Sequence, residues 1–184
     1  MKKLTLIFLL YSTVAFGQWD SVAGGAIWTN SFDLAVWTQT VYNGNLYIGG
    51  QFDTLDRMKA SGLGEWDGTN WNVFSKLGIN NLVISSVVYN GNLIVGGGFD
   101  SINNSPYNNI AQWNGASWSA LGSGMNQAVQ ALAVYNGNLY AGGMFNVGNS
   151  CGIAMWNGSA WVTDCLIKET HPMKHIKQEE PYMH

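Results

Sequence analysis

The chain has 184 residues, of which only 10% are charged, and its formal net charge is −3. This charge balance argues against nucleic acid or an anionic membrane surface as the partner. Glycine (23 residues) and tryptophan (9) are abundant, whereas proline (3) is scarce. Such a composition is typical of an all-β protein in which many short strands are joined by tight turns.

Residues 1–17 have the pattern of a secretory signal peptide. Lys2 and Lys3 precede a mainly apolar run, and Ala15 and Gly17 place small residues before a cleavage site. We therefore expect cleavage after Gly17 and a secreted protein, extracellular or at the cell surface, with 184 − 17 = 167 residues in the mature chain. No stretch reaches the ~18 consecutive apolar residues of a transmembrane helix, so no membrane span is expected.

Two phrases recur three times along the chain. The first, VYNGNLYIGG at 41–50, returns with small changes at 88–97 and 134–143, which are steps of 47 and 46 residues. The second phrase has an Asp-Gly or Asn-Gly pair between two tryptophans, and it occurs at 65–71, 112–118 and 155–161. A fixed period of this length indicates a repeat architecture with one supersecondary unit in each copy.

Each copy reads as four strands. The apolar run 129–135 is typical of a strand buried on both faces. An Asn-Gly pair follows it and predicts a tight type I′ hairpin, and the second phrase supplies another Asn-Gly or Asp-Gly turn between strands three and four. The glycine pair of each returning strand indicates that a neighbouring backbone approaches closely. Four-stranded antiparallel sheets that bury both faces by stacking predict blades of a β-propeller. The alternative is a β-trefoil, which has the same inventory of strands.

The order of apolar strand, glycine pair, variable loop and paired tryptophans resembles the Kelch repeat. It is also similar to the blades of the galactose-oxidase central domain and to Trp-Asn-Gly-rich repeats in secreted proteins of Bacteroidetes, over residues 19–161. The resemblance implies that the glycines and tryptophans hold blades together and are not catalytic. These positions are Gly49, Gly50, Gly96, Gly97, Gly142, Gly143, Trp66, Trp71, Trp113, Trp118, Trp156 and Trp161.

The expected organisation is a signal peptide (1–17), three blades preceded by one extra strand (18–163), and an atypical charged tail (164–184). The tail contains no glycine and holds all three histidines, so its composition differs sharply from that of the repeats. It is expected to be either disordered or foreign to the repeat. Because three blades are few for a propeller, the chain would be an N-terminal piece of a larger propeller or would close a ring by self-association.

No catalytic, cofactor or metal site is predicted. No histidine lies within the repeats, so neither a Ser-His-Asp set nor the copper site of galactose oxidase can be assembled there. His171 and His175 are four residues apart, but Pro172 lies between them. Asp53 and Asp100 occupy equivalent loop positions and are interpreted as loop-capping side chains.

The remaining candidates concern a disulfide and a binding surface. Cys151 and Cys165 could form a disulfide in an oxidising compartment or remain two free thiols, and both alternatives stay open. Trp28 and Trp37 are additional tryptophans of the first copy, and they could either bind a ligand or pack under the long first loop. The variable loops where a ligand would dock are 53–61, 100–109 and 146–152.

These observations favour a secreted, non-catalytic binding, adhesion or scaffold module whose ligand is a protein or a glycan. Two alternatives are kept. The chain could be part of a glycan-acting propeller enzyme whose catalytic residues lie elsewhere, or a truncated product without independent function.

Overall fold

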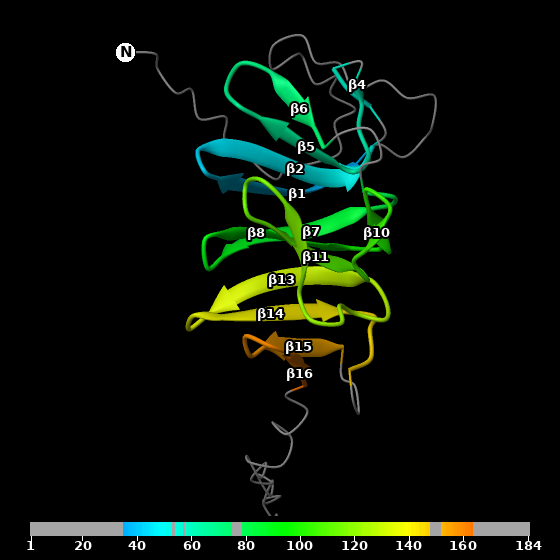
Figure 1. Ribbon diagram of the computed structural model, residues 1–184, viewed down its shortest axis with the longest axis vertical. Helices are drawn as coiled ribbons and strands as arrows, with labels where there is room; N and C mark the ends of the chain where they lie inside the picture. The colour runs from blue at the N-terminus through cyan, green and yellow to red at the C-terminus, as the bar shows by residue number, and fades with distance from the viewer. Residues whose placement is uncertain (1–34, 53, 57, 75–78, 148–151, 164–184) are drawn as a thin grey trace, which may run out of the picture.

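The computed structural model describes residues 35–52, 54–56, 58–74, 79–147 and 152–163. In these ranges the secondary structure consists of strands, with no helix. The strands form three four-stranded antiparallel sheets, one for each copy of the repeat, which follow one another along the long axis of the molecule (Figure 1). The all-β fold with propeller-like blades is therefore as predicted, and separate four-stranded sheets set the β-trefoil alternative aside.

Each blade is a meander in which neighbours in the chain are neighbours in the sheet. Blade 1 contains β1 (Ala35–Tyr42), β2 (Asn45–Gln51), β5 (Leu63–Trp66) and β6 (Trp71–Val73). Blade 2 contains β7 (Val83–Tyr89), β8 (Asn92–Gly97), β11 (Ile110–Trp113) and β12 (Trp118–Ala120). Blade 3 contains β13 (Val129–Tyr135), β14 (Asn138–Gly143), β15 (Ile153–Trp156) and β16 (Trp161–Val162). The small hairpins β3 (Thr54–Leu55)–β4 (Met58–Lys59) and β9 (Ser101–Ile102)–β10 (Ser105–Pro106) are inserted between the second and third strands of blades 1 and 2.

The first turn of each blade is the predicted two-residue hairpin. Tyr42 pairs with Asn45 across Asn43-Gly44, and both turn residues have positive φ, at 49° and 83°. The turns at 90–91 and 136–137 repeat this geometry. Positive φ at both central residues defines the type I′ turn, which matches the twist of the flanking strands.

The second turn of each blade differs from the prediction. Trp66 pairs with Trp71, so four residues separate the strands, and Gly68 has positive φ whereas Asp67 does not. The Asp67 carboxylate accepts hydrogen bonds from the backbone N–H groups of Thr69 and Asn70, each at 2.7 Å. A side chain thus closes this wider loop in place of a tight backbone turn. Asn114 and Asn157 accept the corresponding bonds in blades 2 and 3.

Every blade has two faces, which we name by sequence order. The proximal face carries side chains such as Leu93, Val95 and Trp113 of blade 2, which pack toward blade 1, and the distal face packs toward the following blade. One core lies between blades 1 and 2 and includes Tyr47, Leu63, Val83 and Phe99. A second core lies between blades 2 and 3 and includes Ile94, Ile110, Val129, Leu139 and Phe145. A smaller cluster of Ile48, Phe52, Leu55 and Ala60 lies on the proximal face of blade 1.

The prediction that β13 is buried on both faces is wrong. Val129 is buried, but Gln130, Ala131, Ala133, Val134 and Tyr135 are exposed and Leu132 is half-buried. The reason is that blade 2 covers only the proximal face of blade 3. The apolar composition of the strand shows that both of its faces could be buried. Which faces are buried depends on whether a neighbouring blade covers them.

Several predictions fall on residues outside the described ranges. They are the signal peptide at 1–17, the extra strand at 18–25, Trp28, Asp53, the Cys151–Cys165 disulfide, and the tail at 164–184 with His171 and His175.

Candidate ligand-binding pocket between blades 1 and 2

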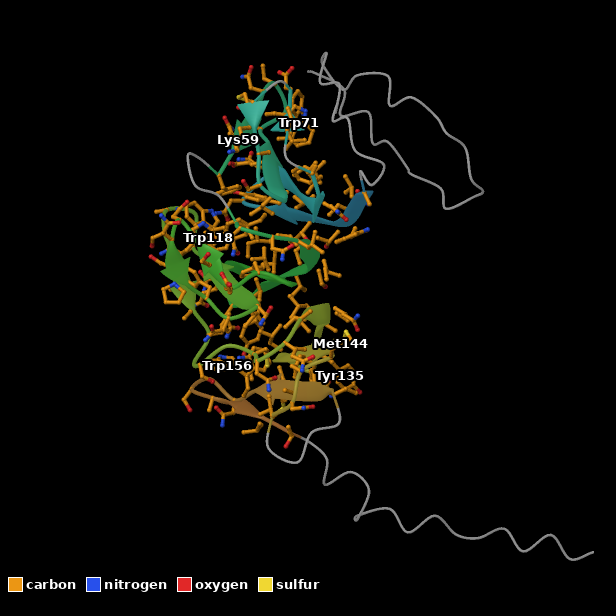
Figure 2. All side chains as sticks on the ribbon, turned by 90° about the vertical axis from the view of Figure 1, so that its right-hand side faces the viewer. Lys59, Trp71, Trp118, Tyr135, Met144 and Trp156 are labelled. Atoms are coloured by element: carbon orange, nitrogen blue, oxygen red, sulfur yellow. The ribbon has the colours of Figure 1, made fainter. Side chains whose placement is uncertain are left out.

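A cavity of about 460 Å³ opens at the outer edge of the contact between blades 1 and 2. Blade 1 supplies Val73, at the end of β6, and Phe74, which follows it. The remaining walls come from blade 2 and its hairpin insertion, with Ile102, Asn103, Ser105, Tyr107, Trp113, Ala116, Ser117 and Trp118. In Figure 2, Trp118 and Trp156 lie on one side of the stack of blades, away from Tyr135 and Met144.

Three aromatic rings form the floor of this pocket. Trp113 and Trp118 face each other across β11 and β12 at a centroid distance of 5.1 Å. Phe74 meets Trp113 edge to face at 5.3 Å and Trp118 at 5.8 Å. Such edge-to-face and tilted contacts fix the orientation of the rings. All three side chains are half-buried, so part of their aromatic surface remains open to a ligand.

The hairpin β9–β10 places the polar side of the pocket. Asn103 and Asn104 form its turn with φ of 51° and 62°, a left-handed conformation that asparagine tolerates better than most residues. The Tyr107 backbone N–H donates to the carbonyl oxygen of Asp100 at 2.9 Å, which anchors the end of the insertion. Asn103, Ser105, Tyr107 and Ser117 therefore add amide and hydroxyl side chains to a lining that also contains the three aromatic rings.

The backbone of the loop at Asp100 is capped by the side chain of Asn80, and the Asp100 carboxylate holds that side chain in place. The carboxylate accepts a hydrogen bond from Asn80 Nδ2 at 2.6 Å, while Asn80 Oδ1 accepts from the backbone N–H groups of Asp100 and Ser101. Blade 3 repeats part of this arrangement, since Asn126 Oδ1 accepts from the backbone N–H of Asn146. These bonds tie the segments before blades 2 and 3 to the loop that follows the second strand of the same blade.

A carboxylate lies behind the aromatic floor. Glu65 Oε1 accepts hydrogen bonds from Asn45 Nδ2 and from the Tyr47 hydroxyl, the latter at 3.1 Å. Burial of Tyr47, together with the negative charge and hydrogen bond of Glu65, raises the pKa of the Tyr47 hydroxyl to about 12. Tyr47 also packs against Phe74 at 5.7 Å, so this polar pair supports the floor of the pocket from inside the core.

The equivalent position between blades 2 and 3 is more closed. Trp161 corresponds to Trp118, but it is buried, and its indole N–H donates to the carbonyl oxygen of Leu121 at 3.0 Å. Gly122 brings the chain onto the Trp156 ring, where a Cβ would lie 3.0 Å from Cζ3. Leu121 stands at the position that Phe74 occupies after blade 1. Of the two interfaces, therefore, only the one between blades 1 and 2 has a third aromatic ring at this position.

The structure separates the predicted residues into two groups. Trp113 and Trp118, predicted as structural, do pack blade on blade and also line the pocket. Trp37, one of the two predicted ligand residues, lies at the bulge of β1, is partly exposed and is not among the lining residues. Phe74 and Tyr107 were missed. Two differences between the copies could have indicated these residues. The first copy has Phe74 where the second has Leu121, and only the insertion of the second copy contains a tyrosine at the position of Tyr107.

The described lining carries aromatic, hydroxyl, amide and aliphatic groups. Within the described ranges no cluster of three or more His, Cys, Asp or Glu side chains could hold a metal ion. The part of the chain that the structure describes also contains no helix long and apolar enough to cross a bilayer. Comparison of the sequence with protein-family models and with curated proteins finds no match.

Proposed function

We propose that the chain is a secreted, non-catalytic binding module and that the pocket between blades 1 and 2 takes a saccharide. The observation that carries this proposal is the combination, in one lining, of an aromatic floor formed by Phe74, Trp113 and Trp118 with side chains that carry hydroxyl and amide groups. A pyranose ring has an apolar C–H face that stacks on an aromatic ring and hydroxyls that need polar partners. Tryptophan and tyrosine offer this mixture of apolar surface and polar edge.

The character of the lining supports binding in preference to catalysis at this pocket. The side chains of the lining are neutral at physiological pH, whereas glycoside hydrolysis ordinarily uses two carboxyl groups at a defined separation. Glu65 lies behind the rings and is engaged by Asn45 and Tyr47. The proposal also includes two expectations from the sequence, that the chain is exported and that its repeats are Kelch-like.

The test is a glycan array followed by titration calorimetry with the best saccharide. Trp118→Ala should weaken binding at least tenfold, which corresponds to about 1.4 kcal/mol, whereas Trp37→Ala should leave the affinity within about twofold. Ala116→Arg provides a second variant, because Ala116 is exposed and lines the pocket, so a long side chain there obstructs it without removing a core ring.

Circular dichroism and thermal unfolding of each variant control for loss of the fold. Absence of binding to any saccharide on the array, or equal loss in the Trp37 and Trp118 variants, would contradict the proposal. Hydrolysis of a bound saccharide would replace it with the enzyme alternative.

A further inference from the structure

The distal face of blade 3 is apolar at positions that are buried in the other two blades. Ile153 is 54% exposed, whereas its equivalents Leu63 and Ile110 are at most 1% exposed. The tyrosine of the repeated phrase follows the same trend, since Tyr42 is 3% exposed, Tyr89 is half-buried and Tyr135 is 66% exposed. Among the described residues, no side chain covers this face as blade 2 covers blade 1. Figure 2 shows Tyr135 and Met144 at the surface of blade 3.

The two filled interfaces show what this face accepts. The first glycine of each pair leaves room for a valine from the first strand of the next blade. A Cβ on Gly49 would lie 2.5 Å from Val83 Cγ1, and a Cβ on Gly96 would lie 2.6 Å from Val129 Cγ1. Val83 and Val129 are fully buried in these notches. The notch is therefore a specific docking feature of each distal face.

Blade 3 has the same notch without its valine. A Cβ on Gly142 would have as nearest neighbours Ala131 Cβ at 3.8 Å and the Gly152 carbonyl oxygen at 3.9 Å, both ordinary contacts. Blade 1, at the other end of the stack, presents the equivalent valine, Val36, but no preceding blade among the described residues offers a notch to receive it. Val36 pairs with Gly50 as Val83 pairs with Gly97, and it is 42% exposed.

The interface between blades 1 and 2 also contains a hydrogen bond from the tyrosine of the repeated phrase. The Tyr42 hydroxyl donates to the carbonyl oxygen of Gly91, in the first turn of the following blade, at 3.1 Å. Tyr135 stands at the position of Tyr42, and Gly44 in blade 1 stands at the position of Gly91. A blade 1 that docked on blade 3 would thus supply an acceptor for the exposed tyrosine hydroxyl as well as a valine for the notch.

We infer that the distal face of blade 3 docks the proximal face of blade 1 of a second copy of this chain, with Val36 entering the Gly142 notch. The contact is heterologous, because the two faces differ, and two copies can make it reciprocally. The same chain carries both halves of an interface that is already formed twice within it. No other occupant is indicated by the described residues.

The test is sedimentation velocity of the full chain over a range of concentrations. The wild type should form dimers. Gly142→Ala should weaken the association at least tenfold, because the added Cβ fills the notch while meeting only ordinary contacts within its own chain. Val36→Asp should do the same from the other face. Gly98→Ala is the matched control, since an added Cβ there meets nothing within 4 Å.

Mixing the two variants tests the head-to-tail geometry. Val36 of the Gly142→Ala chain can still enter the intact notch of the Val36→Asp chain, so the mixture should associate more tightly than either variant alone. A wild type that stays monomeric up to about 100 µM would overturn the inference, as would an unchanged Gly142→Ala chain. Loss on Gly142→Ala with no effect of Val36→Asp would also overturn it, because blade 3 would then pair with itself.

Discussion

The two glycines of each pair are required for different reasons. A Cβ on the second glycine would collide with backbone in its own blade, since Gly50, Gly97 and Gly143 lie against the carbonyl oxygens of Ala35, Leu82 and Ala128. In blades 1 and 2 a Cβ on the first glycine would collide with a valine of the next blade, and on Gly49 it would also meet Thr38 of its own blade. The second glycine therefore allows the strands of one sheet to approach closely, and the first allows two sheets to approach closely.

This difference predicts unequal effects of one substitution at equivalent positions. Gly96→Ala should lower the free energy of unfolding by about 1–3 kcal/mol, the usual cost of forcing extra volume into a packed core. Gly142→Ala should change it by less than about 0.5 kcal/mol in the monomer. Urea unfolding at a dilution where the wild type is monomeric measures both values, and equal costs would contradict the assignment of the first glycine to the inter-blade contact.

The ionisation of Tyr47 makes the free energy of unfolding depend on pH. Its pKa is raised to about 12 in the folded chain by burial and by Glu65, against about 10 when unfolded. Because the folded state holds the proton more tightly, the stability from this group is complete below about pH 10 and is lost as the pH rises toward about 12.

We therefore expect the urea midpoint of the wild type to fall between about pH 10 and about pH 12, the window set by those two pKa values. Tyr47→Phe should flatten this fall, because the titrating hydroxyl is gone. Tyr135→Phe is the matched control, since Tyr135 is exposed, and its pH profile should follow the wild type. A steep alkaline fall that persists in Tyr47→Phe would show that another group controls it.

At the scale of the elements, the same dipeptide forms two kinds of turn. Asn43-Gly44 closes a two-residue hairpin with both residues left-handed, whereas Asp67-Gly68 begins a four-residue loop closed by the aspartate side chain. The flanking pair of tryptophans explains the difference. Trp66 and Trp71 pair across the strands with their rings 5.3 Å apart, which sets the register and leaves four residues for the loop.

The first kind of turn allows a prediction that isolates backbone conformation. Gly91→Ala should cost about 1 kcal/mol, because alanine is strained at a φ of +74° although nothing lies within 4 Å of the added Cβ. Gly98→Ala, which has equal space and no left-handed φ, should be close to neutral. Thermal unfolding compares the two variants in one blade, and equal stability would contradict a conformational cost at the turn.

At the scale of the molecule, the three blades differ in how completely they are covered. Blade 2 is packed on both faces, with Leu93, Ile94 and Val95 fully buried along β8. Blade 3 is packed on one face. Local stability follows buried apolar contact, so blade 3 is expected to open more readily than blade 2.

Hydrogen exchange can measure this difference on nearly identical segments. The amides of 138–143 (NLYAGG) should exchange faster than those of 92–97 (NLIVGG), by at least tenfold in the monomer. Raising the protein concentration should slow exchange in 138–143 selectively, because docking of a second copy would cover that blade. Uniform exchange across both segments at low concentration would contradict unequal blade stability.

Much of the fold could be predicted because its determinants are local. Apolar runs, Asn-Gly and Asp-Gly pairs and the 46–47-residue period predicted the three four-stranded sheets, with bounds within a few residues of those observed. The pocket could not be predicted. Phe74 is distant in sequence from Tyr107 and Trp113, and no local pattern indicates that two blades bring these residues together.

The sequence alone determined which segments form strands, where the chain turns and that the unit repeats, because strand propensity and turn conformation depend on a few neighbouring residues. Only the tertiary structure decided which of these equivalent faces are covered. Val36, Val83 and Val129 have the same residue type and the same register, yet two are buried in notches and one is exposed. Burial depends on what lies across the interface, and that partner is set by position in the stack.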